Sequence, residues 1–580
     1  MRRLWYLALC AGACARPAPP SPVPVDAPSS ASTPAPDTVQ LVIAGTTDVH
    51  GWLRGWDYFA NAADSSRGLT RIATIVDSVR DANSGRVVLV DAGDDLQGTA
   101  ITSIALRDSL LPNPIIQAMN ALRYDAAVIG NHEFNYGLSY LNRAVGQAAF
   151  PMLAANVYRP DGGQPYMARA VLDRAGVRVA VIGATTPGSM IWDRDKLRGR
   201  VEVRDIVPTV RSSVSDARAQ GAEVVVVVLH SGLDGLSSYD TATTGVASEN
   251  VAARVAREIP GIDVIVFGHS HRELPDTTIQ GVLLQQPRNS AGSLSVATLT
   301  LVREGGRHRV VTKHGQVIRA RGHAEQEAML TVTESAHERA QKHVAEALGT
   351  TPVAWRADTA RVMDTPIIDF VLEVQRRAAN TDLASTSAFN LNAEFGPGDV
   401  TRADIAELYP YENNRLRAVR ITGRQLRDYL EFSARYFRAH PSPDSLIDPR
   451  IPGFNFDIVA GVNYVIDLTR PIGSRITQLT RNGRPVSDSD TFTMALNDYR
   501  QSGGGGYTML QGALVVYDRG QLVRELLIDE VRRAGTLRPA DYFERNWRIV
   551  PDSMASAAYR SMRRLPYDRP RATGTPPANP

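Results

Sequence analysis

Six short apolar runs, rich in β-branched residues, constrain the fold of this chain more than any other feature. They lie between residues 39 and 319 and read LVIAG, RVVLV, AAVIG, VRVAVIG, EVVVVVL and DVIVFG. Longer helix-compatible stretches, such as 70–83 and 201–220, separate them. Apolar runs of this length, bounded by turn signals, are typical of buried strands. The alternation predicts an α/β domain over residues 39–322.

Polar side chains follow five of these runs directly. Loops at the carboxyl edge of an open α/β sheet converge, so these side chains are expected to meet there. A single histidine after a strand is more often a hydrogen-bonded packing residue, but five of the eleven histidines fall in these positions. The candidate ligands are Asp48, His50, Asp94, Asn131, His230, His269 and His271.

This ligand chemistry predicts a centre with two metal ions. Carboxylate, imidazole and amide groups suit borderline divalent ions such as Zn, Mn, Co or Fe. Seven ligands are too many for one tetrahedral ion and about right for two. The only cysteines are Cys10 and Cys14, which excludes a thiolate metal site or disulfide framework from the body of the chain.

The charge balance argues against a nucleic-acid polymer as partner. Sixty-four Lys and Arg residues face 61 Asp and Glu residues, which leaves a formal net charge of +3. A surface that coats nucleic acid needs a stronger basic excess.

The N-terminus indicates export to a bacterial cell envelope. Residues 1–13 combine Arg2 and Arg3 with an apolar stretch of about ten residues, too short to span a bilayer and typical of a signal peptide. The sequence AGAC resembles a lipobox, which predicts lipidation at Cys14; ordinary cleavage nearby, leaving a soluble periplasmic protein, is the alternative. The Pro/Ala/Ser tract of residues 14–38 predicts an extended spacer.

The remaining chain divides into three predicted parts. Residues 323–348 lack Gly and Pro and are rich in Ala, Glu and Gln, which predicts one long connecting helix. Residues 349–556 carry mixed strand and helix signals and are expected to form a second domain. The tail, residues 557–580, is expected to be disordered.

Five ordered motifs carry a family resemblance. TTDVHG, DAGDDLQGT, GNHEFNYG, LHSG and GHSH resemble the calcineurin-like metallophosphoesterases, and are most similar to the 5′-nucleotidase/2′,3′-cyclic-nucleotide phosphodiesterase family. The resemblance covers residues 39–550. It implies an N-terminal α/β/β/α sandwich, a connecting helix and an α+β C-terminal nucleotide-binding domain.

The resemblance also implies the division of ligands. Asp48, His50, Asp94 and His271 would hold one ion; Asp94, Asn131, His230 and His269 would hold the other, with Asp94 bridging. Two such ions clamp a phosphoryl oxygen and lower the pKa of water. His132 would not bind metal but would stabilise charge in the transition state.

The residue at position 135 distinguishes two branches of the family. In the 5′-nucleotidase branch an Asp at this position pairs with the histidine, whereas Asn135 would orient His132 in the catalytic site without stabilising its cation by charge. The string GNHEFNYG looks like the branch that combines 2′,3′-cyclic-nucleotide 2′-phosphodiesterase with 3′-nucleotidase activity. A 5′-nucleotidase or UDP-sugar hydrolase is the enzyme alternative. An inactive surface binding protein is the remote one.

Motifs of the second domain predict the substrate contacts. LYPYENN and LNDYR resemble the family's substrate loops, and they place Tyr411 and Tyr499 as aromatic rings on either side of a base. Asn413 would be a polar contact, and Arg500 and Asn390 are candidate ribose or phosphate contacts. A single tyrosine is more often a packing residue. The expected partners are nucleotides, the expected state is a monomer, and membrane contact would occur only through the lipid anchor.

Overall fold

The computed structural model describes residues 38–108, 112–442, 445–554 and 556. The predicted signal peptide, Cys14, the linker up to Asp37 and the tail from residue 557 lie outside the described residues. Within those ranges, no helix has both the length and the apolar character needed to cross a membrane.

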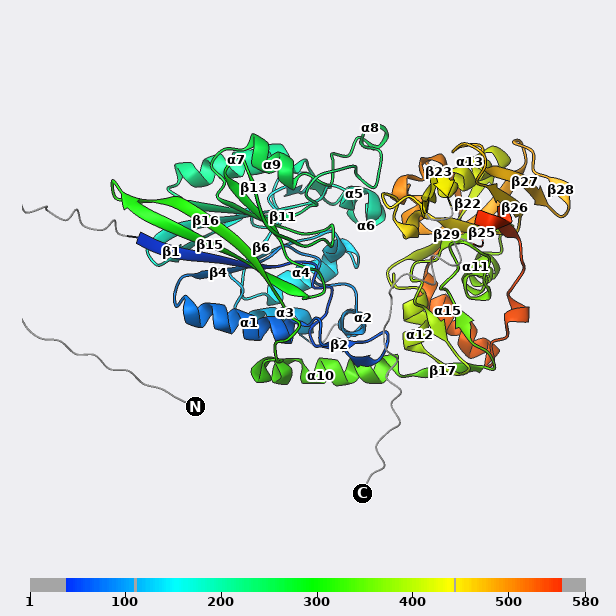
Figure 1. Ribbon diagram of the computed structural model, residues 1–580, viewed down its shortest axis with the longest axis horizontal. Coiled ribbons are helices and arrows are strands. Elements are labelled where there is room, and N and C mark those ends of the chain that lie inside the picture. Colours follow the sequence, from blue (N-terminus) through cyan, green and yellow to red (C-terminus); the bar gives the residue numbers. More distant parts are fainter. Residues whose placement is uncertain (1–37, 109–111, 443–444, 555, 557–580) are drawn as a thin grey trace, which may run out of the picture. The chain divides into compact units, whose positions relative to one another are not determined.

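The first domain contains two six-stranded sheets (Figure 1). In the first sheet, β1 pairs in parallel with β4, β4 with β5, and β5 with β6, while β15 and β16 add antiparallel strands at one edge. Its strands, in spatial order, are β16 (Arg307–Arg319), β15 (Ser293–Glu304), β1 (Thr38–Thr46), β4 (Val87–Asp91), β5 (Ala126–Val128) and β6 (Met152–Leu153).

The second sheet has a parallel centre of four strands with an antiparallel strand at each edge. Its order is β13 (Leu274–Ile279), β14 (Val282–Gln286), β12 (Val264–Phe267), β11 (Val224–His230), β9 (Val177–Thr185) and β8 (Arg169–Arg174). All six predicted apolar runs form strands of these two sheets.

In the central strands of each sheet, alternating side chains are buried on both faces. In β1, Leu41 and Ile43 belong to a core shared with the second sheet, whereas Val42 and Ala44 point to the opposite face. β11 behaves likewise, since its even-numbered valines enter the shared core and its odd-numbered ones face helices. A strand buried on both faces reads as a continuous apolar run because its side chains alternate between two apolar layers.

Helices cover the outer faces and complete an α/β/β/α sandwich, as the resemblance implied. Against the first sheet lie α1 (Leu69–Ala82), α3 (Pro114–Leu122) and α4 (Leu138–Gln147). Against the second lie α7 (Ile206–Ala219) and α9 (Ala252–Glu258), as Figure 1 shows.

The predicted connecting helix packs one face against the first domain's core. α10 (Glu327–Val344) buries Met329, Ala340 and Val344 in the same cluster as α1 and α3. It ends before the predicted boundary at residue 348, because Ala347 already begins β17 (Ala347–Thr351), which pairs with β21 (Gly398–Thr401) of the second domain.

The second domain has an α+β architecture around one large core. A five-stranded sheet runs in the order β25 (Asp457–Ala460), β19 (Leu383–Ser387), β29 (Thr491–Asn497), β22 (Arg415–Thr422) and β30 (Leu514–Leu522). A four-stranded sheet has the order β28 (Arg484–Pro485), β27 (Ile476–Arg481), β26 (Asn463–Asp467) and β31 (Trp547–Val550). The main helices are α11 (Pro366–Ala379), α12 (Arg402–Leu408), α13 (Gly423–Ser433), the single turn α14 (Asp498–Gln501) and α15 (Val523–Ala534).

Candidate active site

Two groups of three metal-ligating side chains lie beyond the carboxyl ends of the sandwich strands. One group is Asp48, His50 and His271, and the other is Asp94, His230 and His269; in each, one ligand atom per residue lies within 4.8 Å of the others. The division coincides with the two ligand sets that the resemblance implies. The bridging role of Asp94 stays a prediction.

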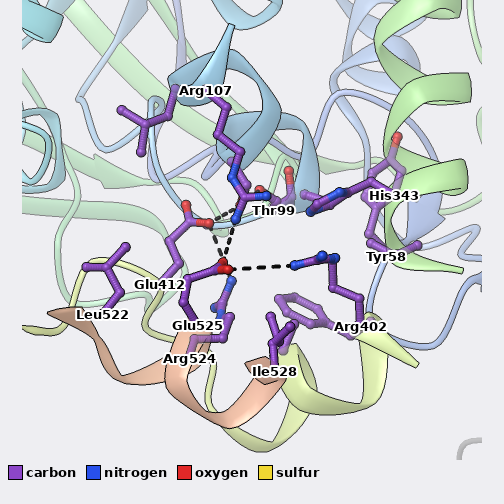
Figure 2. Close-up of a pocket in the computed structure, with 17 residues that line it drawn as sticks. Tyr58, Thr99, Arg107, His343, Arg402, Glu412, Leu522, Arg524, Glu525 and Ile528 are labelled. Atoms are coloured by element: carbon purple, nitrogen blue, oxygen red, sulfur yellow. Dashed lines mark hydrogen bonds and ion pairs between the residues drawn. The ribbon is translucent and has the colours of Figure 1, made fainter. Parts of the chain in front are cut away.

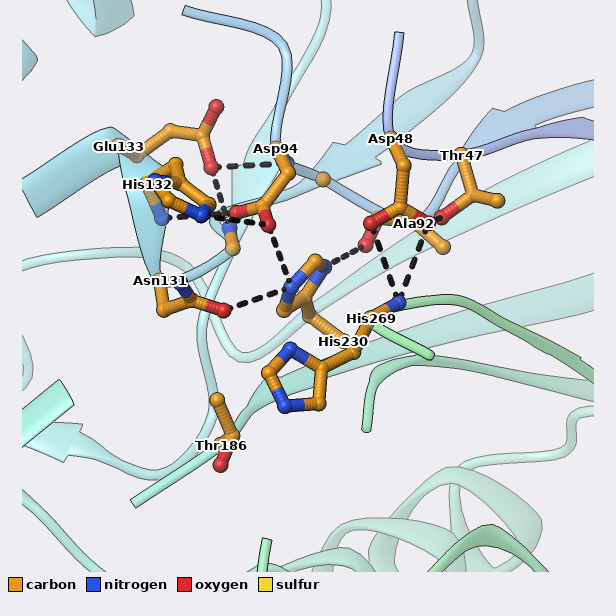
Figure 3. A network of polar contacts seen from close by, with 12 residues as sticks. Thr47, Asp48, Ala92, Asp94, Asn131, His132, Glu133, Thr186, His230 and His269 are labelled. Carbon is orange, nitrogen blue, oxygen red and sulfur yellow. Dashed lines mark hydrogen bonds and ion pairs between the residues drawn. The ribbon is translucent and has the colours of Figure 1, made fainter. Parts of the chain in front are cut away.

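Both sheets contribute to each group. The first sheet supplies Asp48 and His50 after β1 and Asp94 after β4, while the second supplies His230 at the end of β11 and the other two histidines after β12. Asn131, which follows β5, reaches across to the second sheet, where its Oδ1 lies 2.9 Å from His230 Nε2 (Figure 3).

Backbone carbonyls set the tautomers of two ligands. His230 Nδ1 lies 2.7 Å from the Ala92 carbonyl oxygen, and His50 Nδ1 lies 2.8 Å from that of Gln97. A carbonyl oxygen only accepts, so each Nδ1 must carry the hydrogen, and in the neutral ring Nε2 keeps the lone pair that a metal requires.

Several metal-binding atoms then lie at short distances from one another. His230 Nε2 lies 2.9 Å from Asp94 Oδ2 and 2.9 Å from Asn131 Oδ1, and His50 Nε2 lies 3.1 Å from His271 Nε2. Burial opposes a charge on His230, but the Asp94 carboxylate outweighs burial and raises the pKa of His230 to about 10. These atoms therefore favour a cation between them, and the carboxylate, imidazole and amide ligands suit a divalent metal ion in each group.

The other group also favours a cation. Burial and the neighbouring His271 lower the pKa of His50 to about 4, which keeps this ring neutral and able to bind metal. Burial works against ionisation of Asp48, yet His271 outweighs it and lowers the pKa of Asp48 to about 2.

The backbone of the ligands is strained and closely packed. Five of the seven predicted ligands have positive φ, between 49° and 71°; they are Asp48, His50, Asp94, His269 and His271. Neighbouring glycines make room for them. A Cβ on Gly268 would lie 1.9 Å from Thr47 Oγ1, and one on Gly130 would lie 2.3 Å from Asp94 Oδ1. Left-handed non-glycine residues that persist in this way are typical of functional sites.

Glu133 holds the two loops that carry Asp94 and Asn131. Its carboxylate accepts four backbone N–H groups, at 2.6–3.1 Å, from Asp94, Asp95, Leu96 and Gly130. Burial, followed by the charge of Asp94, raises the pKa of Glu133 to about 7. Glu133 lies within the GNHEF string but was not among the predicted site residues.

His132 lies beside the second group without belonging to it. Its backbone N–H donates to Asp94 Oδ1 at 2.7 Å, and its Nε2 lies 3.9 Å from Asp94 Oδ2. On the other side of the ring, Nδ1 lies 2.7 Å from Asn135 Oδ1. The ring thus turns its Nε2 toward the metal ligands (Figure 3).

Two tyrosines predicted to contact a base are half-buried. Tyr411 packs edge-to-face on Phe389, with centroids 5.0 Å apart. Tyr499 lies on α14, against Gly504, where a Cβ would come within 2.7 Å of the ring. Burial raises the pKa of Tyr499, Arg500 opposes this, and Glu249 and Tyr411 add to it.

One of those charged neighbours, Glu249, also lies beside a candidate metal ligand. Glu249 Oε2 lies 3.9 Å from His269 Nε2. The neighbour of Tyr411, Glu412, accepts hydrogen bonds from the hydroxyls of Ser103 and Tyr136 in the first domain.

The other predicted substrate contacts differ in how far their polar atoms already have hydrogen-bond partners. Asn413 Oδ1 is buried without a hydrogen-bond partner among the described residues. Asn390 Nδ2 has long contacts of 3.3 and 3.4 Å to Glu407.

Arg500 is 3% exposed and forms a two-bond ion pair with Asp457, at 2.7 and 2.8 Å. Its remaining nitrogen contacts go to Gly504, Phe454 and Asn455. These bonds hold Arg500 against the loop of residues 503–506, and a direct substrate contact stays a prediction.

A cavity lies beside the loop of residues 98–100 (Figure 2). Its arginines already face carboxylates, since Arg107 pairs with Glu525 at 2.5 Å and Arg524 pairs with Glu412 at 3.3 Å. None of the residues that line it is a candidate metal ligand. The chemistry therefore belongs to the strand ends and not to this cavity.

Comparison with known proteins supports both domains. Residues 41–273 match the family model described as calcineurin-like phosphoesterase, and residues 347–512 match the model described as 5′-nucleotidase, C-terminal domain.

Among curated proteins, a 2′,3′-cyclic-nucleotide 2′-phosphodiesterase/3′-nucleotidase of Haemophilus influenzae is 31% identical over 88% of either chain. A trifunctional nucleotide phosphoesterase of Bacillus subtilis is 30% identical over 92% of this chain, which spans 40% of that longer protein. Among solved structures, a putative 5′-nucleotidase from Staphylococcus aureus superposes with a TM-score of 0.76 and is 24% identical, covering 88% of this chain and 100% of that one. The last similarity supports the fold alone.

Proposed function

The chain belongs to the calcineurin-like phosphoesterases that carry a 5′-nucleotidase C-terminal domain, and from this premise we propose that it is a two-metal hydrolase of nucleotide phosphoesters. One observation carries the proposal. Carboxylate, imidazole and amide groups from two sheets converge at the strand ends in two clusters, as a pair of metal ions requires.

The proposed substrates are 2′,3′-cyclic nucleotides and 3′-nucleotides. One water opens the cyclic ester at its 2′ bond and leaves a 3′-phosphate; a second water releases that phosphate from the nucleoside. Asn135 beside His132 and the similarity to enzymes named for both activities support this choice over a 5′-nucleotidase or UDP-sugar hydrolase. The reactions fit a role in nucleotide and phosphate scavenging.

The two ligand groups would each hold one divalent ion, with Asn131 in the second. When bound, two such ions polarise a phosphoryl oxygen and lower the pKa of water. The Nε2 atom of His132 faces the candidate metal ligands, where a ring N–H stabilises charge that develops on the phosphoryl group. Glu133 and the carbonyls of Ala92 and Gln97 keep the ligands oriented.

The second domain would bind the nucleoside. Tyr411 and Tyr499 provide aromatic faces for the base, and stacking of this kind tolerates different bases. Asn413, whose Oδ1 is buried without a hydrogen-bond partner among the described residues, is kept as the predicted polar contact. Asn390 and Arg500 are retained as weaker candidates for ribose or phosphate contacts.

A panel of substrates tests the proposal. The purified protein, supplied with Zn²⁺ or Mn²⁺, should turn over 2′,3′-cyclic AMP and 3′-AMP with a kcat/KM about tenfold or more above that for 5′-AMP and UDP-glucose, a gap of about 1.4 kcal/mol. Preference for 5′-AMP would overturn the branch, and no turnover of any nucleotide by the metal-loaded protein would overturn the function.

Two variants separate the roles in that panel. Asp94→Ala should abolish turnover of every substrate. Tyr499→Ala should raise KM for nucleotides by about tenfold, in line with ~1–3 kcal/mol per stacked base, and leave turnover of a base-free phosphodiester unchanged. An unaltered nucleotide KM would contradict the role of Tyr499.

We also infer export and anchoring at the cell envelope. The cationic and apolar residues 1–13 and the AGAC string that ends at Cys14 support this. Mass spectrometry of the mature N-terminus should find an acylated Cys14; a different, unmodified N-terminus would contradict the anchor. The monomeric state is part of the same proposal.

A further inference from the structure

A buried carboxylate that no sequence motif indicated lies behind His132. Asp193 follows α5 (Ser189–Trp192) and precedes α6 (Arg194–Leu197), 58 residues beyond Asn135. It is only 3% exposed. Burying a carboxylate is costly unless it is paired and hydrogen-bonded, so its partners indicate its role.

Each carboxylate oxygen of Asp193 has one partner. Oδ2 accepts from Asn135 Nδ2 at 2.9 Å, and Oδ1 accepts from Lys196 Nζ at 2.6 Å. Since Asn135 Oδ1 lies 2.7 Å from His132 Nδ1, the groups form one line: His132, Asn135, Asp193, Lys196.

Helix capping does not account for Asp193. It stands at the N-cap position of α6, yet its side chain accepts no backbone N–H from that helix. Both oxygens are instead used by the Asn135 amide and by the lysine that balances the charge.

The carboxylate determines which way the amide points. A carboxylate only accepts, so Asn135 must direct its NH₂ group to Asp193 and its oxygen to His132. An amide oxygen also only accepts, so His132 Nδ1 must carry a hydrogen. With the ring fixed in this way, Nε2 is the atom that faces Asp94 and the metal ligands.

We propose that Asp193 is a positioning residue for the phosphoester hydrolysis: by orienting the Asn135 amide, it holds the His132 ring so that Nδ1 donates to the amide oxygen and Nε2 faces the reacting phosphoryl group. This rests on the proposed function. In this arrangement an amide and a more distant carboxylate together orient the catalytic histidine.

Exchanging the two side chains provides the test. In Asp193→Asn, a single amide oxygen must serve both Asn135 and Lys196, so one hydrogen bond is lost or the Asn135 amide turns over. In Asn135→Asp, two carboxylates face each other. In the double variant N135D/D193N, Asp at 135 accepts from His132 and from the amide at 193, whose oxygen accepts from Lys196, and every hydrogen bond is restored.

Turnover of 2′,3′-cyclic AMP should follow this pattern. Each single variant should lower kcat about 10–100-fold, as is usual when an outer-shell hydrogen-bond partner of a functional side chain is lost. KM should stay within about twofold of wild type. The double variant should recover to within about threefold of wild type. Asp263→Asn is the matched control, because Asp263 is a largely buried aspartate paired with Arg218 at 2.6 Å, away from the site, and its loss should affect thermal stability but not kcat.

A second readout is independent of the substrate. In Zn²⁺-loaded protein with ¹⁵N-labelled histidine, the His132 Nδ1 should show an N–H that is hydrogen-bonded to the Asn135 amide oxygen, and D193N should shift or remove this signal. If wild type hydrolyses no nucleotide, the proposed function fails and this spectrum still decides the inference. A double variant no better than the worse single one, or a His132 spectrum unchanged in D193N, would overturn it.

Discussion

Five ligands of the candidate metal centre hold backbone conformations that glycine adopts far more easily. At each of them a non-glycine residue with positive φ costs of order 1–3 kcal/mol. The surrounding structure must therefore hold these residues in place, and glycines packed directly against them do so. Gly130 and Gly268 pack so closely on Asp94 and Asp48 that neither position has room for a methyl group.

Gly130→Ala tests this tight packing. A Cβ there would lie 2.3 Å from Asp94 Oδ1 and 2.6 Å from the Asp94 backbone nitrogen, so the loop of Asp94 must shift. A displacement of about 1 Å at a reacting centre can lower the rate about 10²-fold. We expect a loss of this size in kcat/KM, together with fewer than two bound ions by metal analysis.

Gly146→Ala is the control for that substitution. Gly146 lies inside α4, and a Cβ added there meets nothing within 4 Å. Turnover should be unchanged, and the helix should gain about 0.5–1 kcal/mol because Ala replaces Gly. If G130A kept two ions and normal turnover, the packing argument would be wrong.

At the scale of an element, the start of α11 carries a destabilising pair of carboxylates. Asp364 and Asp369 are 8% and 3% exposed, and the Oδ1 atom of each has no hydrogen-bond partner among the described residues. Burial, and then the charge of Asp364, raises the pKa of Asp369 to about 8. The pair is therefore accommodated best when at least one carboxyl is protonated.

This pair predicts a stability that falls as pH rises. The folded-state pKa of Asp369 lies above its ordinary value near 4, so the folded protein binds more protons between those pH values, and stability is lost as pH rises toward 8. Asp369→Asn removes the second charge. We expect it to be on the order of 1–2 kcal/mol more stable than wild type at pH 8, measured by thermal unfolding, with the difference vanishing near pH 4.

Asp382→Asn is the control, because it should change the stability at pH 8 in the opposite direction. Burial opposes the charge of Asp382, but hydrogen bonds from Thr493 and the Arg481 partner lower its pKa, so its charged form stabilises the fold above pH 4. D382N should therefore lower stability at pH 8. A D369N protein that melts below wild type at pH 8 would refute the explanation offered for the pair.

At the scale of the whole molecule, the metal centre joins two sheets. Ligands from β1, β4 and β5 meet ligands from β11 and β12, so ions bound there cross-link the two halves of the sandwich. Ligands that bind the folded state alone stabilise it by mass action, by about 4 kcal/mol at a thousandfold excess over Kd.

Chelation should thus lower the melting temperature as well as the activity. We expect a drop of about 5 °C or more on removal of both ions, reversed by Zn²⁺ or Mn²⁺. His271→Ala, which removes one ligand, should show a smaller shift. An unchanged melting temperature in protein that metal analysis finds free of ions would contradict the cross-link.

The strands and the positions of the candidate metal ligands follow from local patterns in the sequence. Each apolar run became a strand because its alternating side chains are buried on both faces. The candidate ligands stand directly after those runs, so the sequence alone predicts that they gather at strand ends. α10 ended before its predicted boundary because Ala347 pairs with Thr401, a contact that no local signal reveals.

Only the tertiary structure decided which groups orient the site. The apolar sequence segments do not show whether one sheet or two supplies the ligands. The two-sheet arrangement was expected only from the family resemblance. Asp193 lies 58 residues from Asn135, and the carbonyls of Ala92 and Gln97 look like any others in the sequence. The physical reason is that ligand chemistry resides in side chains next to a strand, whereas hydrogen bonds that fix a tautomer join atoms brought together only by the packed fold.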